Sequence, residues 1–301
     1  MMIYHAENHC RGATHDDAFY ASIGYARSLD AHGFTWPTPD PSEATRYEVV
    51  DGPVPRPSVS PDALGDSAVS AFIDKGSMGS DYLYAYFIEY TFSTSYISVA
   101  RAHLTGTDPP TFYKYSGGSS WTTPGLLSGA VTTNYATPLF NTSTQLGNCS
   151  GTASMKDPSI VETTDSKYVF VVTCKEGASG TYPGQRGFFY AVADNLTSQD
   201  WTPLYEAGGF STPAPCGADG SKPEQKYDGW YPSVFSPGEE PGIIGGTGII
   251  FELDGCLTGT RHIGIRPFSL GVPDPESTKR RAHPNASTAP QPAAGTTRAK
   301  L

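Results

Sequence analysis

A group of three short strands that recurs along the chain is the sequence feature that most constrains the fold. In its clearest copy, residues 157–161 form a mostly apolar segment that opens with an acid and a proline. Residues 167–174 and 187–193 follow, and both are rich in β-branched and aromatic side chains. Thr, Asp, Ser, Gly and Pro fill the gaps and supply the chemistry of turns. The pattern predicts an all-β protein.

Two further copies of this group show the same order of strands. They comprise residues 66–73, 82–87 and 96–101 upstream, and residues 231–235, 248–253 and 261–266 downstream. An all-β unit that returns about every 70 to 90 residues predicts an array of four-stranded antiparallel sheets, and hence a β-propeller. Residues 2–9 and 20–28 have the pattern of the second and third strands of one more unit.

The domain organisation follows from these units. We expect one propeller domain over residues 1–271 and a disordered tail over residues 272–301, because the tail lacks apolar periodicity. Three complete units and a partial one fit a five-bladed propeller that is incomplete at its N-terminus. The units are expected over about residues 1–50 (the partial first blade), 66–117, 151–208 and 228–270.

Composition excludes several classes of partner. The formal net charge of -10 argues against nucleic acid, because phosphate binding requires clustered Lys and Arg. No apolar run approaches the roughly 18 residues of a membrane span. We expect a monomer with no cofactor, nucleic-acid partner or membrane partner.

The cysteines occupy repeated positions. Cys174 and Cys256 end the second strands of their units, whereas Cys149 and Cys216 precede first strands. Repeat symmetry suggests the disulfides Cys149–Cys174 and Cys216–Cys256, and it leaves Cys10 to pair with a residue missing from this chain. The alternative of five unpaired thiols in a cytosolic protein stays open.

Glycosylation sequons and disulfides together favour a secreted protein. The N-terminal residues have the pattern of a strand rather than of a signal peptide, so we interpret the start of the chain as truncated. The sequons lie at Asn141, Asn148, Asn195 and Asn285.

The first residues of the inner strands are candidates for ligand contact. In a propeller the first strand of each blade lines the central channel, so its early residues face a ligand at the mouth. This places Asp157 and Tyr231 near the axis, with Asp66 or Ser67 as their equivalent in the second unit. Trp230 and Tyr231 are candidates for stacking on sugar rings. A plain turn at Asp157, and packing of Trp230 between blades, are the alternatives.

His5, Glu7 and His9 alternate along one strand, which places their side chains on one face. A carboxylate between two histidines is a candidate for proton transfer, with both histidines near the substrate. The alternatives are the exposed face of an edge strand, or a metal site. A metal site needs a further ligand and a second shell of hydrogen bonds. The sequence identifies neither, so no metal is predicted.

Three features of the third unit carry a resemblance to a known family. They are Asp157-Pro158-Ser159, the strand Tyr-Val-Phe-Val-Val, and the third strand that leads through Ala193-Asp194-Asn195-Leu196 to Trp201. Together they look like a blade of the five-bladed-propeller glycoside hydrolases of family 43, which include arabinanases, arabinofuranosidases and β-xylosidases. Residues 97–102 and His5-Ala6-Glu7 are also similar to that group, so the resemblance covers most of residues 1–270.

The resemblance implies a glycosidase that uses three axial acids on arabinose- or xylose-containing polysaccharides. Such hydrolysis requires a protonated acid and a second carboxylate that flank the glycosidic bond. Asp157 matches the acid that orients and tunes, and Glu7 is preferred to Glu224 as the general acid. The base would lie on an inner strand that this chain lacks. We therefore expect a glycosidase for the full-length parent and an inactive 301-residue chain.

Other functions fit the same pattern of strands, because fold alone does not determine function. A lectin-like propeller that binds carbohydrate without cleaving it is the main alternative, and a scaffold for protein partners is another. Three carboxylates at one mouth of the channel would favour the hydrolase, and two or fewer would favour the lectin. Arg27, Arg101 and Arg266 could suggest a sialidase, but third strands lie away from the axis, which favours ion pairs at the surface or between blades.

Overall fold

The computed structural model describes most of the predicted strands and part of the loops between them. The described residues are 2–8, 19–30, 33–35, 63–76, 81–90, 95–104, 110–124, 135–147, 149, 155–174, 187–209, 226–256 and 261–270. The tail predicted over residues 272–301 lies outside them, so its disorder stays a prediction.

The described part of the chain is all-β apart from one helical turn, α1 (Ser143–Leu146). This confirms the all-β part of the predicted fold class; the five-bladed propeller stays a prediction. Nowhere in that part is there a helix with the length and apolar character needed to cross a membrane.

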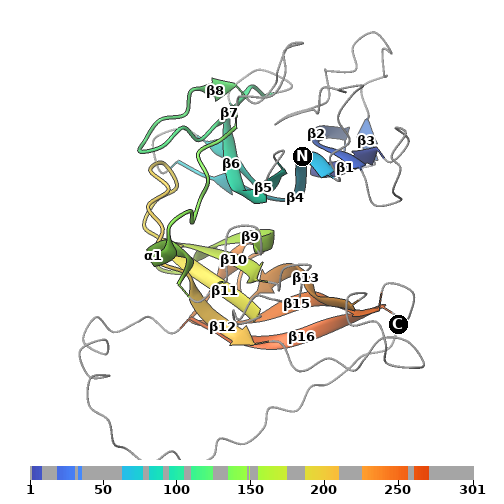
Figure 1. The fold of residues 1–301 in the computed structure, drawn as a ribbon, viewed down its shortest axis with the longest axis vertical. Helices are drawn as coiled ribbons and strands as arrows, with labels where there is room; N and C mark the ends of the chain where they lie inside the picture. Colours follow the sequence, from blue (N-terminus) through green and yellow to red (C-terminus); the bar gives the residue numbers. More distant parts are fainter. Residues whose placement is uncertain are drawn as a thin grey trace, which may run out of the picture.

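The strands fall into four consecutive units (Figure 1). The first unit contains β1 (Met2–Asn8), β2 (Phe19–Asp30) and β3 (Gly33–Thr35). The second contains β4 (Ala63–Asp74), β5 (Tyr82–Tyr90), β6 (Ser95–His103) and β7 (Phe112–Lys114), followed by β8 (Thr123–Pro124). The third contains β9 (Met155–Thr163), β10 (Tyr168–Cys174), β11 (Gly187–Ala193) and β12 (Tyr205–Gly209). The fourth contains β13 (Lys226–Phe235), β15 (Thr247–Cys256) and β16 (Arg261–Ser269), and β14 (Ile243–Ile244) lies between its first two strands in sequence.

Consecutive strands within each unit pair in an antiparallel manner, which is the arrangement that short polar turns favour. Two short parallel contacts join neighbouring units. The start of β2 pairs with the start of β4, which merges the first two units into one sheet, and β14 pairs with the end of β9. The inner strand β9 contacts the inner strands of both neighbouring units, β4 and β13.

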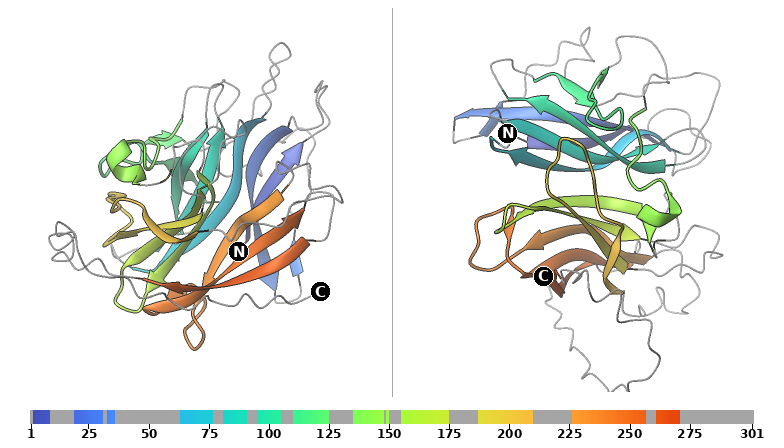
Figure 2. Two further views of the ribbon diagram at one scale, coloured as in Figure 1. Left: turned by 60° about the horizontal axis from the view of Figure 1, so that its bottom comes forward. Right: turned by 90° about the vertical axis from the view of Figure 1, so that its left-hand side faces the viewer.

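The second and third units each pack one sheet face against the unit before and the other against the unit after. We call these the trailing face and the leading face. Hydrophobic clusters lie between the first and second, second and third, and third and fourth units. In the right-hand view of Figure 2 the blue-to-teal strands of the first two units form a layer above the green-to-red strands of the last two.

The interface between the second and third units is rich in aromatic side chains. The ring of Tyr86, on the leading face of the second unit, lies 5.7 Å from that of Phe170 and 6.2 Å from that of Trp201. Phe72 of β4 meets Tyr168 edge to face at 5.7 Å. Full burial of one such side chain contributes about 1.5–3 kcal/mol to stability, so this interface holds the two units together.

Candidate functional site

Each of the three described inner strands contains a β-bulge at the same register. The pairing with the neighbouring strand shifts at one place in β4 and in β9 and at two places in β13, of which the second, between Trp230 and Ser233, matches the other two. The first residue of every bulge is a non-glycine residue with positive φ: Ala68 (49°), Asp157 (54°) and Tyr231 (52°). Two residues further on, a serine lies opposite the second strand of the unit in all three cases. These serines are Ser70, Ser159 and Ser233.

This register corrects one alignment made from the sequence. The equivalent of Asp157 in the second unit is Ala68, not Asp66 or Ser67, because a bulge inserts an extra residue that strand periodicity does not reveal. Asp157 and Tyr231 do occupy matching positions. A left-handed backbone at a non-glycine residue costs about 1–3 kcal/mol, and such strain gathers at functional sites. The three bulges therefore define the candidate site.

Asp157 is the charged member of the three bulge residues and is 4% exposed. Its neighbour Lys156 is also largely shielded from water. Burial lowers the pKa of Lys156 below its ordinary value, and the negative charge of Asp157 opposes that shift. The Lys156 ammonium Nζ donates a hydrogen bond of 3.3 Å to Oγ of Ser95 in β6. The start of β9 is thus fixed to the second unit beside the bulge.

A disulfide holds the same strand from the other side. Cys149 and Cys174 are bonded, with their Cα atoms 5.8 Å apart, which confirms the predicted pair. Cys174 lies opposite Met155, two residues before Asp157. Cys216 lies outside the described residues, and so does the side chain of Cys256 at the end of β15. Their bond stays a prediction.

The two aromatic candidates lie at the bulge of β13. Tyr231 is 53% exposed, so its ring is available to a ligand. Trp230 lies opposite Leu253 in the backbone register, and the surroundings of its side chain fall outside the description. Stacking of Trp230 on a sugar stays a prediction.

The first-unit candidates lie on β1, where His5 is opposite Ile23 and Glu7 is opposite Ala21. His5 is half-buried and shares its strand face with Ile3, which packs against the cluster between the first two units. The side chain of Glu7 and the whole of His9 lie outside the described residues. No cluster of three His, Cys, Asp or Glu side chains that could hold a metal ion occurs in the part of the chain that was searched, the described residues.

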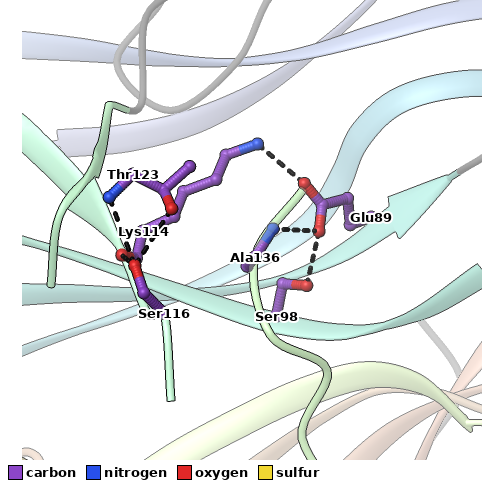
Figure 3. A network of polar contacts seen from close by, with 6 residues as sticks. All are labelled: Glu89, Ser98, Lys114, Ser116, Thr123 and Ala136. Carbon is purple, nitrogen blue, oxygen red and sulfur yellow. Dashed lines mark hydrogen bonds and ion pairs between the residues drawn. The ribbon is translucent and has the colours of Figure 1, made fainter. Parts of the chain in front are cut away.

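A buried polar network beside the bulge of β4 was missed from the sequence (Figure 3). Glu89, at the end of β5, lies opposite Asp66 in register and is 1% exposed. Its carboxylate accepts hydrogen bonds from Nζ of Lys114 at 2.7 Å, Oγ of Ser98 at 2.8 Å and the backbone N–H of Ala136 at 3.1 Å. The network thus joins β5 to β6, to β7 and to the segment that contains Ala136.

The network anchors the second unit and is not a source of protons for catalysis. A general acid must reach its substrate and hold a proton, whereas the carboxylate of Glu89 is enclosed by donors. Two features of the sequence could have indicated this network: one acid within the otherwise apolar strand 82–90, and one lysine between Tyr113 and Tyr115.

Two of the three arginines considered from the sequence make interactions within the fold. The Arg101 guanidinium lies 4.6 Å from the ring centroid of Tyr82 and 4.5 Å from that of Trp121. Arg266 forms an ion pair with the buried Glu252 between the third and fourth units. Both rings that Arg101 contacts belong to its own unit, and the Arg266–Glu252 pair joins two strands of the fourth unit, so neither contact is the predicted ion pair between blades. The Arg266 guanidinium also lies 5.9 Å from the ring centroid of Phe188 in the third unit. The side chain of Arg27 lies outside the described residues.

Comparisons with known proteins give only distant similarity. No protein-family model and no curated protein matches the chain. One solved structure that overlaps with it comes from the GH130 family of mannoside phosphorylases, which contains glycoside hydrolases that target β-1,2 mannosidic linkages in Candida mannan. That match has a TM-score of 0.34 and 16% identity over 67% of this chain. A candidate glycoside hydrolase from Parabacteroides distasonis matches with a TM-score of 0.28 and 13% identity over 63% of this chain.

The chain spans less than half the length of these solved proteins, 45% and 47% respectively. At these TM-scores the overlap is too loose to establish a shared fold or activity. The functional argument therefore rests on the residues at the bulges.

Proposed function

We propose that this chain forms the ligand-binding part of a five-bladed β-propeller glycoside hydrolase that acts on arabinose- or xylose-containing glycans. The observation that carries the proposal is the buried Asp157, held at a strained bulge that recurs in three inner strands. Bulges re-aim side chains, and binding groups gather where inner strands meet. The family resemblance of the third unit supplies the reaction class.

Asp157 suits the role of an orienting carboxylate. The charge of Asp157 acts on the neighbouring Lys156, where it opposes the lowering of the Lys156 pKa by burial. An anionic carboxylate accepts hydrogen bonds from sugar hydroxyls and does not donate a proton. The acid that protonates the leaving oxygen must be a different group. We assign that role to Glu7.

A lectin-like function is the second candidate, and two observations favour it. Among the three bulge residues that the structure describes, only Asp157 is a carboxylate; the others are Ala68 and Tyr231. The half-exposed ring of Tyr231 suits stacking on the apolar face of a sugar without any cleavage. In both functions Asp157 contacts the glycan.

We further propose that the protein is secreted and glycosylated. The Cys149–Cys174 disulfide is typical of oxidising compartments. Two of the sequon asparagines, Asn141 and Asn195, are exposed on the surface and therefore open to a glycosyl transferase.

The test is a hydrolysis screen of the protein extended upstream of Met1, against aryl glycosides and plant or fungal polysaccharides. Asp157→Asn and Glu7→Gln are assayed in parallel, and circular dichroism checks their folding. The hydrolase proposal predicts sugar release that both substitutions abolish. Binding of glycan without release would favour the lectin. Release that survives both substitutions would refute the assigned roles.

A further inference from the structure

A glycosylation sequon lies in the turn that follows β11. The sequon is Asn195-Leu196-Thr197. The Asn195 side chain accepts hydrogen bonds from the backbone N–H groups of Thr197 at 3.1 Å and of Ser198 at 3.2 Å. Oγ of Ser198 donates a third bond, also at 3.2 Å. The asparagine is therefore held in an Asx turn, in which the side chain bonds the backbone two residues further on.

These bonds fix which branch of the Asn195 amide faces the backbone. All the partners are N–H or O–H donors, so the atom that accepts them is Oδ1. The amide nitrogen Nδ2, to which a glycan would be bonded, lies on the other branch of the same planar amide. Asn195 is exposed, whereas Leu196 beside it is 1% exposed. The folded turn can therefore carry a glycan on Nδ2 while every bond to Oδ1 stays in place.

The second unit holds this turn from the opposite side. The indole N–H of Trp121 donates to the carbonyl oxygen of Thr197 at 2.8 Å. The hydroxyl of Tyr115 donates to the carbonyl oxygen of Ser198, also at 2.8 Å. Leu196, the middle residue of the sequon, belongs to the hydrophobic cluster between the second and third units. The backbone of the sequon is thus part of the interface between these two units.

N-glycosylation transfers an oligosaccharide from a polyprenyl diphosphate carrier to an asparagine. The bond between C1 of the first sugar and the diphosphate oxygen breaks, and the diphosphate leaves with the electron pair. Nδ2 of the asparagine bonds to C1 and loses one proton. The transferase recognises the asparagine together with the hydroxyl residue two positions further on, so it must bind the whole sequon.

Docking of the second unit hinders that recognition at Asn195. Exposure brings the amide of Asn195 within reach of the enzyme, but the carbonyl oxygen of Thr197 is bonded and Leu196 is buried. To bind all three residues, the enzyme would have to displace the turn from the second unit. That displacement breaks the bonds from Trp121 and Tyr115 and exposes Leu196 to water. The transfer is therefore fast only before the two units dock.

The sequon lies at the end of the third unit that is remote from Asp157. The strand β11 ends at Ala193 opposite Tyr168, and it begins opposite Cys174. Cys174 lies beside the start of β9, next to the bulge. The 7 residues of β10 that separate these two ends span about 20 Å at the rise of a β-strand. A glycan on Asn195 therefore leaves the candidate site at Asp157 open.

The sequon Asn141-Thr142-Ser143 is held differently. All three of its residues are exposed. Thr142 is the N-cap of α1, and its hydroxyl accepts a hydrogen bond of 3.3 Å from the backbone N–H of Gln145 in the same helical turn. Release of this local cap frees the sequon, so we expect Asn141 to accept a glycan both before and after folding.

We propose that Asn195 carries an N-linked glycan that is attached before the third unit docks on the second and that stays at the surface of the folded protein. The inference rests on the proposed secretion and glycosylation. It assigns a different stage of folding to each of the two exposed sequons: Asn195 is modified only before docking, and Asn141 is open at both stages.

The first experiment expresses the 301-residue chain behind a secretory signal peptide in a eukaryotic cell. An amidase that converts glycosylated asparagine to aspartate, followed by mass spectrometry of peptides, measures the occupied fraction of each sequon. Asn195 and Asn141 should both be occupied. Thr197→Ala should abolish the glycan on Asn195 alone, and it keeps the backbone N–H bonds to Oδ1, so the turn persists. Glycan on Asn141 with none on Asn195 would overturn the assignment. Glycan on neither would refute the proposed glycosylation of the protein, and this inference with it.

The second experiment adds a purified transferase and its lipid-linked oligosaccharide to the folded, unmodified chain made in the bacterial periplasm. Asn195 should be modified at least about tenfold more slowly than Asn141, because local opening must come first. The double variant Trp121→Phe with Tyr115→Phe removes both hydrogen bonds from the second unit but keeps aromatic rings there. It should raise the rate at Asn195 toward that at Asn141, and circular dichroism checks that it is folded.

Equal rates at the two sequons of the folded wild type would overturn the proposed order of attachment. An unchanged rate at Asn195 in the folded double variant would show that the second unit does not close this sequon, and would overturn the physical basis of the proposal. A folded wild type that accepts no glycan on Asn141 would overturn the contrast between the two sequons.

Discussion

The bulge residues Ala68, Asp157 and Tyr231 share a backbone conformation that their side chains disfavour. Asp tolerates the left-handed region better than Ala or Tyr, because its short polar side chain bonds locally. Ala68 gains nothing of that kind, so its conformation is imposed by the strand pairing around it. The same backbone conformation therefore occurs at Ala68 in the second unit, which has no functional group, and at Asp157 in the third unit, which carries a buried carboxylate.

Ala68→Gly should raise the free energy of unfolding by about 1 kcal/mol, because glycine adopts positive φ without the cost of a Cβ atom and the lost methyl group is only half-buried. Ala71→Gly is the control: Ala71 is exposed, lies in the same strand and is absent from the positive-φ residues, and its replacement should lower stability by about 0.5–1 kcal/mol. Denaturant unfolding measures both. Equal destabilisation by the two substitutions would show that the bulge is not strained.

Lys114→Met should destabilise the protein by about 3–5 kcal/mol, because it leaves the buried carboxylate of Glu89 without its counter-charge. The double variant Lys114→Met with Glu89→Gln should recover most of that loss, since a glutamine oxygen still accepts from Ser98 and Ala136. Lys167→Met, in the exposed pair with Asp194 at 3.6 Å, should change stability by less than about 1 kcal/mol. Additive losses in the double variant would contradict a coupled pair.

At the scale of elements, the strands were predictable and their irregularities were not. Alternating and β-branched runs placed β5, β10 and β11 correctly, and the repeated cysteine positions identified the Cys149–Cys174 bond. The bulges escaped prediction because one inserted residue leaves composition and periodicity almost unchanged. The Glu89 network escaped because its partners come from three separate segments that only the folded sheet brings together.

The disulfide should contribute about 3 kcal/mol to stability, because its cysteines are 25 residues apart and the bond restricts the unfolded chain. Cys149→Ser with Cys174→Ser should show this loss in denaturant unfolding. The double variant should also bind glycan more weakly, because the bond fixes the strand that leads into Asp157. Unchanged stability in the double variant, or in the wild type after reduction, would show that the strand is held by packing alone.

At the scale of the whole molecule, the units are held together by tyrosine-rich interfaces. The stability of these interfaces depends on the pH, because the buried phenols can ionise. Burial is the largest cause that raises the pKa of several phenols above the ordinary value of 10.0, and it acts most strongly on the fully buried Tyr86. A raised pKa in the folded state stabilises the fold below pH 10, and that stability is lost as the pH rises further. The phenols concerned are Tyr84, Tyr86, Tyr96, Tyr115 and Tyr190.

We therefore expect cooperative unfolding on the alkaline side of about pH 10. Tyrosinate absorbance from the buried set should rise together with loss of the β-sheet circular dichroism signal. Tyr86→Phe should make the free energy of unfolding depend less steeply on pH. This substitution also removes the hydrogen bond from the hydroxyl to Oε1 of Gln199. Complete tyrosine titration with the sheet signal intact would show that these phenols are open to solvent.

The most direct test of the central claim, that Asp157 contacts a glycan at the inner-strand bulge, is calorimetric titration of the 301-residue chain with arabino- and xylo-oligosaccharides. It compares the wild type with Asp157→Asn and with Asp194→Asn, whose carboxylate lies on the same unit but is 84% exposed. We predict that Asp157→Asn weakens binding by about tenfold or more and that Asp194→Asn leaves it unchanged. Equal affinity in all three proteins, or no binding by the wild type, would contradict the account.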